Sequence, residues 1–541
     1  MRLELNAAGE GGFVPMPVPS PIPRPSRDLV ELAALVLFGL LSLWVLGLDL
    51  YQAAAHGQVW TGTDGVYITD QMQYLAWIRD TAHHGLAANL FVLRGTSADY
   101  FQPAVEISAL LTALGVAPWL ALLMWKPVAV VCLFFAFRGY VHRGLSGRAA
   151  RRTALVLALF FGSFTLLYGS WTVVGDLMPG FLSWGYEFGV LAMALMVFAL
   201  LSYVRAREGR RVSLWPGALG ALASLLHPWQ GELMIVILFG SEALMWRSER
   251  GPLWQRLRLP AITIAIVGLA LLYYELLGRF DESWRLARVA SKHGFPFWPV
   301  VLAMVPLIVP ALFAWRPRRL TFTAAMTRVW PLSALLIWVL SASALSATPL
   351  HAVQGLTLPL GVLAVEGASR LRLQRLPAAR VWLVAAVLLL TVPGTVELMS
   401  VGKSLAAPTP NNPNFISHDE RQALRYLARN PKGGGVLTRM YLGTAVPALT
   451  GRRVFVGDCL WSEPGCFTRI NVTQALFQGS MTPVQARAFV RSSGARFVLS
   501  DCQQPSELSQ TLGSLVISVH RFGCAAVYEL DSPVPPSGPL K

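Results

Sequence analysis

Two aspartates, Asp64 and Asp70, lie in the segment 51–104, the longest polar interruption of an otherwise apolar chain. A carboxylate can act as a general base that takes the proton of a hydroxyl nucleophile. Two carboxylates that face each other can also bind a divalent cation such as Mg²⁺ or Mn²⁺. We expect Asp70 to be a catalytic base and Asp64 to be its companion. If a metal is used, we expect these two residues to bind it.

Each aspartate also has a structural interpretation. Asp70 begins a stretch with helical periodicity, 70–83, and a carboxylate at a helix N-terminus can cap free N–H groups. The same stretch carries an apolar stripe suited to lying on a membrane surface. Asp64 precedes Gly65, a pair that is common in turns. Both interpretations stay open at the level of sequence.

The composition is that of a polytopic membrane protein. Hydrophobic residues make up 54% of the 541 residues and charged residues 14%. Apolar runs recur at about 20 residues, the length that crosses a hydrocarbon core. The formal net charge of +16 falls mostly in arginine clusters between these runs. This placement indicates membrane topology and argues against a nucleic-acid partner.

The arginine clusters predict the orientation of the chain. Loops rich in arginine, such as 143–152, 205–211 and 316–328, face the cytoplasm by the positive-inside rule. We expect a polytopic α-helical membrane domain at 29–400 with about 11 spans. An odd number of spans places the N-terminus in the cytoplasm and the C-terminal region outside.

The ends of the chain differ from this domain. Residues 1–28 are rich in proline and lack a cleavage site after an apolar core, which predicts a disordered cytoplasmic tail. Residues 401–532 predict a small external α/β domain, followed by a flexible tail at 533–541.

Local signals within 401–532 predict its elements. Ser417 and Glu420 form a capping box before a helix at 419–429, and a second helix is expected at 482–492. Strands are expected at 435–438, 453–456, 496–499 and 525–528.

Four cysteines fall in this region: Cys459, Cys466, Cys502 and Cys524. An even number of cysteines in an external domain predicts two disulfides. We favour the pairs Cys459–Cys466 and Cys502–Cys524 because each closes a local loop. The other pairings and a zinc site remain open.

Two histidines, His227 and His351, lie at the ends of apolar runs that we place on the same side as Asp70. Glu232 lies close to the first histidine. Ionisable groups at a membrane are costly unless they have a partner or a function. We therefore expect these residues to share a pocket with Asp70, and the alternative is that each histidine is an interfacial anchor.

The opening segment resembles that of the GT-C class of membrane glycosyltransferases. In both, a first span is followed by an external loop with an early aspartate and then by an interfacial helix. The matching stretches are Thr69-Asp70-Gln71-Met72-Gln73-Tyr74-Leu75, His84-Gly85-Leu86-Ala87-Ala88-Asn89 and Tyr100-Phe101-Gln102-Pro103. Many members have two adjacent acidic residues, whereas Gln71 follows Asp70 here.

The resemblance implies inverting transfer of a sugar from a polyprenyl-phosphate donor to an envelope glycan, lipid or protein. The reaction would take place on the outer face of a bacterial cytoplasmic membrane. A phosphate leaving group needs a cation beside it. The candidates are Arg79, Arg279, Arg285, Arg288, Lys292 and His293. Most lie in 279–293, whose alternative interpretation is an amphipathic helix with solvated charges.

Two other functions remain as alternatives: a transporter or flippase for a lipid-linked substrate, and a non-catalytic protein of envelope assembly. A transporter predicts inverted repeats and broken mid-membrane helices, and neither is clear in this sequence. The sequence contains no P-loop, dinucleotide-binding fingerprint, zinc-protease motif or serine-hydrolase motif.

Overall fold

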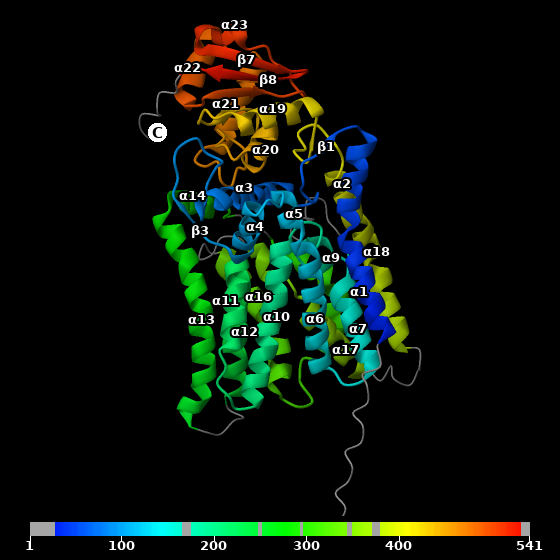
Figure 1. Ribbon diagram of the computed structural model, residues 1–541. Coiled ribbons are helices and arrows are strands. Elements are labelled where there is room, and N and C mark those ends of the chain that lie inside the picture. The colour runs from blue at the N-terminus through cyan, green and yellow to red at the C-terminus, as the bar shows by residue number, and fades with distance from the viewer. Residues whose placement is uncertain are drawn as a thin grey trace, which may run out of the picture.

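The computed structural model describes residues 28–164, 175–246, 252–292, 296–342, 349–370 and 379–531. It has two parts: a bundle of apolar helices and, on one end of the bundle, a C-terminal domain with a four-stranded sheet (Figure 1). We call this end of the bundle the upper end, as it is drawn. Residues 1–27 of the tail predicted at 1–28, and the whole tail predicted at 533–541, lie outside the described residues.

Seven helical segments of the described chain are long and apolar enough to cross a membrane. They are Leu29–Ala55 (α1 Leu29–Ser42 and α2 Trp44–Ala55), Pro118–Gly144 (α5 Pro118–Leu123 and α6 Trp125–Gly144), Glu187–Glu208 (α10), Leu253–Phe280 (α13), Phe322–Ser341 (within α16, Phe322–Ala342), Leu350–Arg370 (η1 Pro349–Val353 and α17 Thr357–Arg370) and Ala385–Leu405 (within α18, Ala379–Leu405).

The other helices of the bundle and its upper end are shorter. They are α4 (Pro103–Ala113), α7 (Arg148–Phe160), α9 (Pro179–Leu182), α11 (Trp215–Leu226), α12 (Pro228–Met245), α14 (Glu282–Ala290) and α15 (Trp298–Leu312). The expected count of about 11 spans is not confirmed, because the described residues give seven. Helices α11 and α15 stop after 12 and 15 residues, short of the roughly 20 needed to cross a bilayer. Helix α11 ends at Leu226, and its C-cap His227 has extended backbone, because the following Pro228 disfavours helical backbone there.

Helix α3 (Ile68–His84) lies across the upper end of the bundle, under the C-terminal domain (Figure 1). It contacts α4 of the bundle and α20 (Met440–Thr450) of the C-terminal domain. Its apolar stripe therefore does not lie on a membrane surface: Trp77 is 4% exposed and Ile78 is fully buried within the protein. Tyr67, not Asp70, is the N-cap, so Asp70 lies inside the first turn and does not cap the helix.

The connections rich in arginine lie at the lower end of the bundle. Those between α6 and α7 and between α10 and α11 are opposite the C-terminal domain (Figure 1). Arg143, near the end of α6, forms an ion pair with Glu208, the last residue of α10, so the two connections begin side by side. This agrees with a cytoplasmic lower end and an external C-terminal domain, an orientation that stays a prediction.

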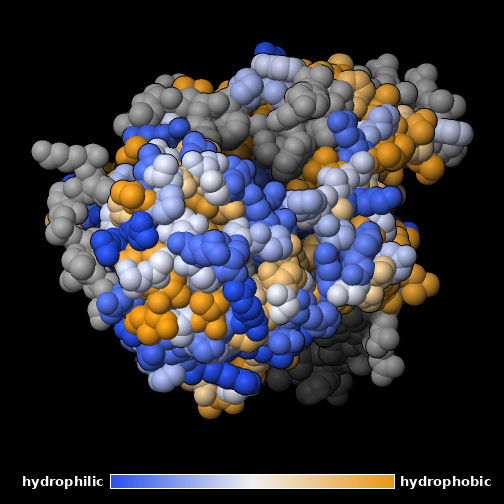
Figure 2. All heavy atoms as spheres, turned by 90° about the horizontal axis from the view of Figure 1, so that it is seen from above, coloured by the Kyte–Doolittle hydropathy of each residue, from blue (hydrophilic) through white to orange (hydrophobic). Residues whose placement is uncertain are grey.

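The two surfaces of the molecule differ in polarity. Seen from above, the upper face shows mainly hydrophilic side chains with scattered hydrophobic ones (Figure 2). On the side of the bundle, by contrast, Leu269, Leu272 and Phe280 of α13 are 66%, 48% and 84% exposed. Exposed apolar side chains along a long helix fit contact with lipid.

The C-terminal domain contains a mixed sheet in the order β5-β6-β8-β7. Strands β5 (Val436–Leu437) and β6 (Phe497–Ser500) are parallel, and β8 (Ala525–Leu530) pairs antiparallel with β6 and with β7 (Val516–Phe522). The helices and 3₁₀ turn of this domain are α19 (His418–Arg429), α20, α21 (Cys466–Phe477), α22 (Pro483–Ser493), α23 (Ser509–Leu512) and η3 (Gly513–Leu515).

Most local predictions for this domain are confirmed. Ser417 and Glu420 form the predicted capping box of α19, and Thr482 caps α22 in the same way. The stretch 453–456 is not a strand of the sheet; it forms only an isolated bridge, from Val454 to Val436. Strand β7 was not predicted.

Two short strand pairs complete the upper end. Strand β1 (Val59–Trp60) pairs with β4 (Phe415–Ile416), which ties the polar segment to the start of the C-terminal domain. Within the polar segment, β2 (Ala87–Ala88) pairs with β3 (Ala98–Tyr100).

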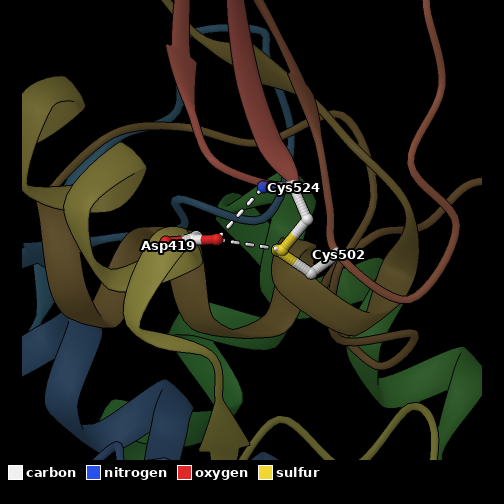
Figure 3. Close-up of side chains that lie close together, drawn as sticks. All are labelled: Asp419, Cys502 and Cys524. Carbon is white, nitrogen blue, oxygen red and sulfur yellow. Dashed lines mark hydrogen bonds between the residues drawn. A yellow bond between two sulfur atoms is a disulfide. The ribbon is translucent and has the colours of Figure 1, made fainter.

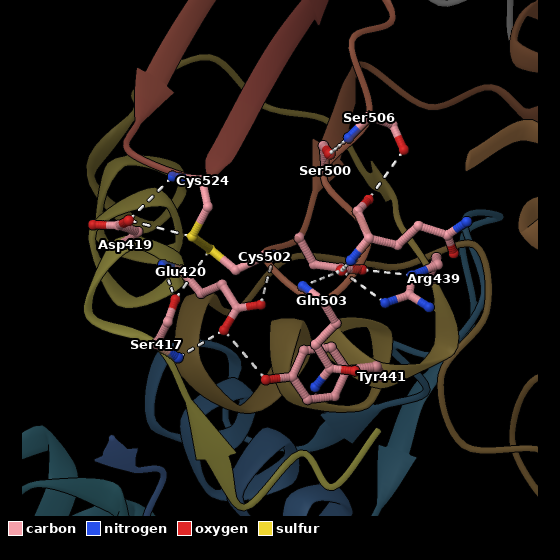
Figure 4. Close-up of a disulfide and its surroundings, with 12 residues drawn as sticks. Ser417, Asp419, Glu420, Arg439, Tyr441, Ser500, Cys502, Gln503, Ser506 and Cys524 are labelled. Carbon is pink, nitrogen blue, oxygen red and sulfur yellow. Dashed lines mark hydrogen bonds and ion pairs between the residues drawn. A yellow bond between two sulfur atoms is a disulfide. The ribbon is translucent and has the colours of Figure 1, made fainter. Parts of the chain in front are cut away.

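Both disulfides have the favoured pairing, Cys459–Cys466 and Cys502–Cys524. Figure 4 shows the second, which joins the segment after β6 to the turn between β7 and β8. Beside it, Glu420 accepts hydrogen bonds from the Cys502 amide at 3.0 Å and the Tyr441 hydroxyl at 3.2 Å. The disulfide and the capping box of α19 therefore stabilise the same corner.

Asp419 lies beside this disulfide and accepts a hydrogen bond from the backbone N–H of Cys524 at 3.1 Å (Figure 3). Its carboxylate and the two sulfur atoms lie within 4.8 Å of one another, as in a metal site. Zinc binds cysteine as the thiolate, and these sulfurs are joined to each other, so the cluster does not fit a zinc site.

Candidate active site

A cavity of about 350 Å³ lies between α3, the upper ends of α11, α12 and α13, helix α14 and the C-terminal domain. Helix α3 supplies Asp70, Tyr74 and Trp77, while the C-terminal domain supplies Leu460 and Trp461. Segments far apart in the sequence thus form one enclosure. Concave sites of this size, mostly apolar with a few polar groups, are typical of small-molecule binding.

Five residues singled out from the sequence line this cavity: Asp70, His227, Glu232, Arg288 and His351. Asp70 comes from the first turn of α3, His227 and Glu232 from the junction of α11 and α12, and His351 from η1. Arg288 comes from α14. The structure thus brings together the expected base, both histidines and one candidate cation.

Asp70 is close to a second carboxylate, Asp176. His351 Nδ1 lies 2.8 Å from Asp176, and the Gln354 amide donates to it at 3.1 Å, as does the Tyr67 hydroxyl at 3.4 Å. Burial raises the pKa of Asp70 to about 6; the positive charge of His351 opposes this rise, and the charge of Asp176 adds to it. Asp70 accepts no hydrogen bond from the described residues, which leaves its carboxylate available to a substrate.

Asp176 was not among the catalytic candidates from the sequence. The signal that could have found it is an acidic residue in a loop predicted to face the same side as Asp70.

His227 is 3% exposed and lies in an aromatic group. Its ring centroid is 4.7 Å from that of His351, 4.8 Å from Trp229 and 5.6 Å from Tyr186. Neither ring nitrogen has a hydrogen-bond partner among the described residues. Buried polar atoms without a partner are costly unless a ligand or water satisfies them, so these nitrogens are placed to bind a polar group in the cavity.

Aromatic side chains from four segments form one wall of the cavity. Trp77 lies 4.2 Å from Tyr100 between ring centroids, and Trp284 lies 4.9 Å from both Tyr100 and Trp461. Tyr274 lies 5.9 Å from Trp284. Such a wall offers broad apolar faces to a sugar ring or to an isoprenoid chain.

Arg288 is the one arginine or lysine among the described residues that line the cavity. Its Nη1 is 3.0 Å from the carboxylate of Glu275 on α13, which also binds Arg279 Nε at 2.7 Å. Glu232 faces the same cavity from α12. Arg288 thus places a guanidinium group on the wall next to α13, where it pairs with Glu275, which also lines the cavity.

Asp64 does not line the cavity. It is fully buried in an ion pair with Lys126, which also lies 3.3 Å from Glu187. Its backbone N–H donates to Gln71 Oε1 at 2.7 Å. Because an ammonium group already neutralises this carboxylate, Asp64 does not fit a metal site beside Asp70, and it positions the backbone that leads to Asp70 instead.

Arg79 joins α3 to the C-terminal domain. Its Nε donates to the carbonyl oxygen of Ala448 at 3.0 Å. Nearby, the Asn89 amide donates to the Trp461 carbonyl at 2.8 Å and Arg453 donates to the Asn89 carbonyl at 2.7 Å. Arg79 therefore stabilises the position of the domain above the cavity and does not enter it.

The remaining cation candidates also lie away from the cavity. Arg285 and Lys292 are exposed, and Arg279 is 68% exposed in its pair with Glu275. His293 lies outside the described residues.

Solved structures show what this arrangement is similar to. The oligosaccharyltransferase of Archaeoglobus fulgidus in the apo form is 12% identical, with a TM-score of 0.54 over 90% of this chain and 71% of that chain. ArnT from Cupriavidus metallidurans is 14% identical, with a TM-score of 0.50 over 95% of this chain and 99% of that chain. The mycobacterial arabinofuranosyltransferase AftD is 16% identical, with a TM-score of 0.52 over 92% of this chain and 41% of that chain.

Neither a protein-family model nor a curated protein sequence matches this chain. Identities of 12–16% carry an inference about fold, while function has to be argued from the site. The similar structures are GT-C glycosyltransferases, and the likeness extends over at least 90% of this chain. The chain thus has the GT-C fold of membrane glycosyltransferases.

Proposed function

We propose that this protein is a membrane glycosyltransferase that moves a sugar from a polyprenyl-phosphate donor to a hydroxyl group of an envelope glycan, lipid or protein. The observation that carries the proposal is one cavity that holds a guanidinium group, Arg288, and a carboxylate, Asp70, that accepts no hydrogen bond from the described residues. We place the reaction on the external face of a bacterial cytoplasmic membrane.

Asp70 has the properties that a general base needs. With a pKa of about 6 it is ionised at neutral pH and can take a proton from an acceptor hydroxyl. The acceptor oxygen forms a bond to the anomeric carbon as the bond from that carbon to the phosphate oxygen breaks. The phosphate leaves with the bonding electrons, and attack from the opposite face inverts the anomeric configuration.

Arg288 would bind the donor phosphate. It lies on α14, and α13 next to it exposes apolar side chains along which a polyprenyl chain could extend. A guanidinium group binds phosphate through paired hydrogen bonds. The archaeal oligosaccharyltransferase AglB, which has the same fold, has been solved with a dolichol-phosphate, and this supports a lipid-phosphate donor here.

A divalent cation such as Mg²⁺ or Mn²⁺ would be held by Asp70 and Asp176. The charge of Asp176 contributes to the raised pKa of Asp70, and Asp70 accepts no hydrogen bond from the described chain. Carboxylate oxygens are the ligands that a hard cation prefers, and Asp64 is excluded from this set by its ion pair with Lys126. When bound, the ion would offset the charge of the departing phosphate.

The C-terminal domain would help to orient the acceptor. Leu460 and Trp461 cover the cavity from above, so an acceptor that reaches Asp70 has to pass this domain.

The first experiment compares transfer of radiolabelled sugar from a panel of polyprenyl-phosphate donors to an envelope lipid extract by wild type and Asp70→Asn. We expect the variant to lose about a hundredfold or more in rate, the usual contribution of a general base. Glu282→Gln is the matched control, because Glu282 is an exposed carboxylate on the same side that pairs with Arg94. A parallel series with a chelator tests the cation.

The outcomes distinguish a glycosyltransferase that uses Asp70 from the alternative functions. Transfer by wild type and by Glu282→Gln, with loss in a folded Asp70→Asn, establishes the enzyme and its centre. Equal rates in all three proteins would remove Asp70 from the mechanism. Translocation of labelled lipid by wild type without transfer would instead favour the transporter.

A further inference from the structure

A groove on the C-terminal domain lies between α19 and β7 and has a volume of about 770 Å³. Of the residues that the structure describes, none lines both this groove and the proposed catalytic cavity. Its walls come from α19, the turn at 430–432 and the side of β7 that carries Ser518, His520 and Phe522. It is therefore a separate depression on the domain above the membrane bundle.

Aromatic rings form the floor of the groove. The ring of Tyr426 lies 4.4 Å from that of His520 and 5.7 Å from that of Phe522 between centroids. The Asn430 amide donates to the Tyr426 hydroxyl at 3.1 Å, which fixes the orientation of this ring. All three rings are half-buried, so each is held on one side and open on the other.

Positive charge lines one edge of the floor. Arg425 and Arg429 are exposed, lie one helical turn apart on α19, and have no acidic partner among the described residues. The carboxylate that faces them across the groove, Glu529, is already neutralised by Lys432 at 2.6 Å and Arg496 at 3.2 Å. Like charges one turn apart on a helix repel each other, and an anion between the two guanidinium groups would relieve this repulsion.

We propose that this groove binds the acidic sugar residues of an anionic glycan. The apolar C–H face of a pyranose ring packs on Tyr426, and the sugar carboxylate pairs with Arg425 and Arg429. Aromatic rings bury apolar surface of the sugar, and guanidinium groups bind a carboxylate through two parallel hydrogen bonds. This inference stands on the groove alone and does not require the proposed transfer reaction.

The test measures binding of hexagalacturonate, an oligomer of uronic acid, to the full-length protein in detergent by isothermal titration calorimetry. Maltohexaose is the neutral counterpart, and a short single-stranded DNA serves as an anion without sugar carboxylates. The variants are Tyr426→Ala and the double variant Arg425→Gln/Arg429→Gln. Arg421→Gln is the matched control, because Arg421 is an exposed arginine on the same helix that does not line the groove.

We expect wild type and Arg421→Gln to bind hexagalacturonate with equal affinity. Both groove variants should bind it at least about tenfold more weakly. Maltohexaose should bind much more weakly than hexagalacturonate. Absence of hexagalacturonate binding by wild type, or equal binding by all variants, would overturn the proposal. DNA binding as tight as that of hexagalacturonate and unaffected by Tyr426→Ala would replace it with a cationic surface that binds anions without specificity.

Discussion

The pKa of Asp70 sets the pH dependence that we expect for the proposed reaction. Burial raises this pKa to about 6, and the negative charge of Asp176 contributes to the rise. Asp70 lies in the first turn of α3 but does not cap it, so its ionisation is set mainly by the cavity and less by the helix.

We expect kcat/KM for sugar transfer to rise with pH and to reach half of its plateau near pH 6. The base form of Asp70 exists above its pKa, so activity falls about tenfold per pH unit well below that value. Asp176→Asn removes a neighbouring negative charge, lowers the pKa of Asp70, and shifts this midpoint to lower pH. The measurement is the pH profile of kcat/KM for both proteins.

Glu282→Gln is the control for this profile, because Glu282 is 55% exposed and pairs with Arg94. A profile of wild type that is flat between pH 5 and 8 would contradict the role of Asp70 as the base.

At the scale of elements, the two arginines of α14 lie in different surroundings, one at the cavity and one in the exposed surface. The side chain of Asp281 caps the helix by accepting the N–H of Trp284 at 2.8 Å. From this start, Trp284 and Arg288 point into the cavity wall, while Arg285 is exposed. The helix is thus amphipathic, which is the alternative interpretation of 279–293 from the sequence, and one of its arginines nevertheless lines the cavity.

We expect Arg288→Gln to raise the KM for a polyprenyl-phosphate donor about ten- to a hundredfold, the value of a charge-assisted hydrogen bond. The KM for the acceptor should stay close to that of wild type, because Arg288 is proposed to contact only the donor phosphate. The measurement is steady-state kinetics with each substrate varied in turn.

Arg279→Gln is the matched variant, since Arg279 shares the carboxylate of Glu275 but does not line the cavity. If both substitutions raised the donor KM equally, a general effect of charge near α13 would explain the result better than a phosphate contact.

At the scale of the whole molecule, the polar segment 51–104 is held between the bundle and the C-terminal domain. On the domain side, Asn414 accepts hydrogen bonds from Thr63 at 2.7 Å and Thr61 at 3.2 Å. On the bundle side, buried Lys126 pairs with Asp64 and Glu187.

We expect Lys126→Met to destabilise the protein by about 3–5 kcal/mol, because it leaves two buried carboxylates without a cation. The double variant Lys126→Met/Asp64→Asn should recover part of this loss, since one of the unpaired charges is removed. The measurement is the thermal unfolding midpoint of each protein in the same detergent.

Equal midpoints for Lys126→Met and wild type would show that this ion pair does not stabilise the segment. A double variant less stable than Lys126→Met would show that Asp64 stabilises the protein through other contacts.

Much of the fold could be predicted from the sequence, because its signals are local. Apolar runs and arginine clusters indicated a membrane bundle, and Ser417 with Glu420 marked the start of α19. The short spacing of cysteines favoured the disulfide pairs that are present. Short apolar runs are harder to assign: the sequence counts the runs of α11 and α15 as spans, whereas these helices have only 12 and 15 residues.

The sequence by itself determined that Asp70, His227 and His351 belong to one side of a membrane protein, because charge bias and span order fix the side on which a turn lies. Only the tertiary structure decided which carboxylate acts on Asp70. Asp64 is closer in sequence, yet it is buried against Lys126, whereas the charge of Asp176 contributes to the raised pKa of Asp70. Sequence separation does not determine distance in a folded chain, and the low polarity of the interior makes a buried charge depend on whichever partner the packing brings to it.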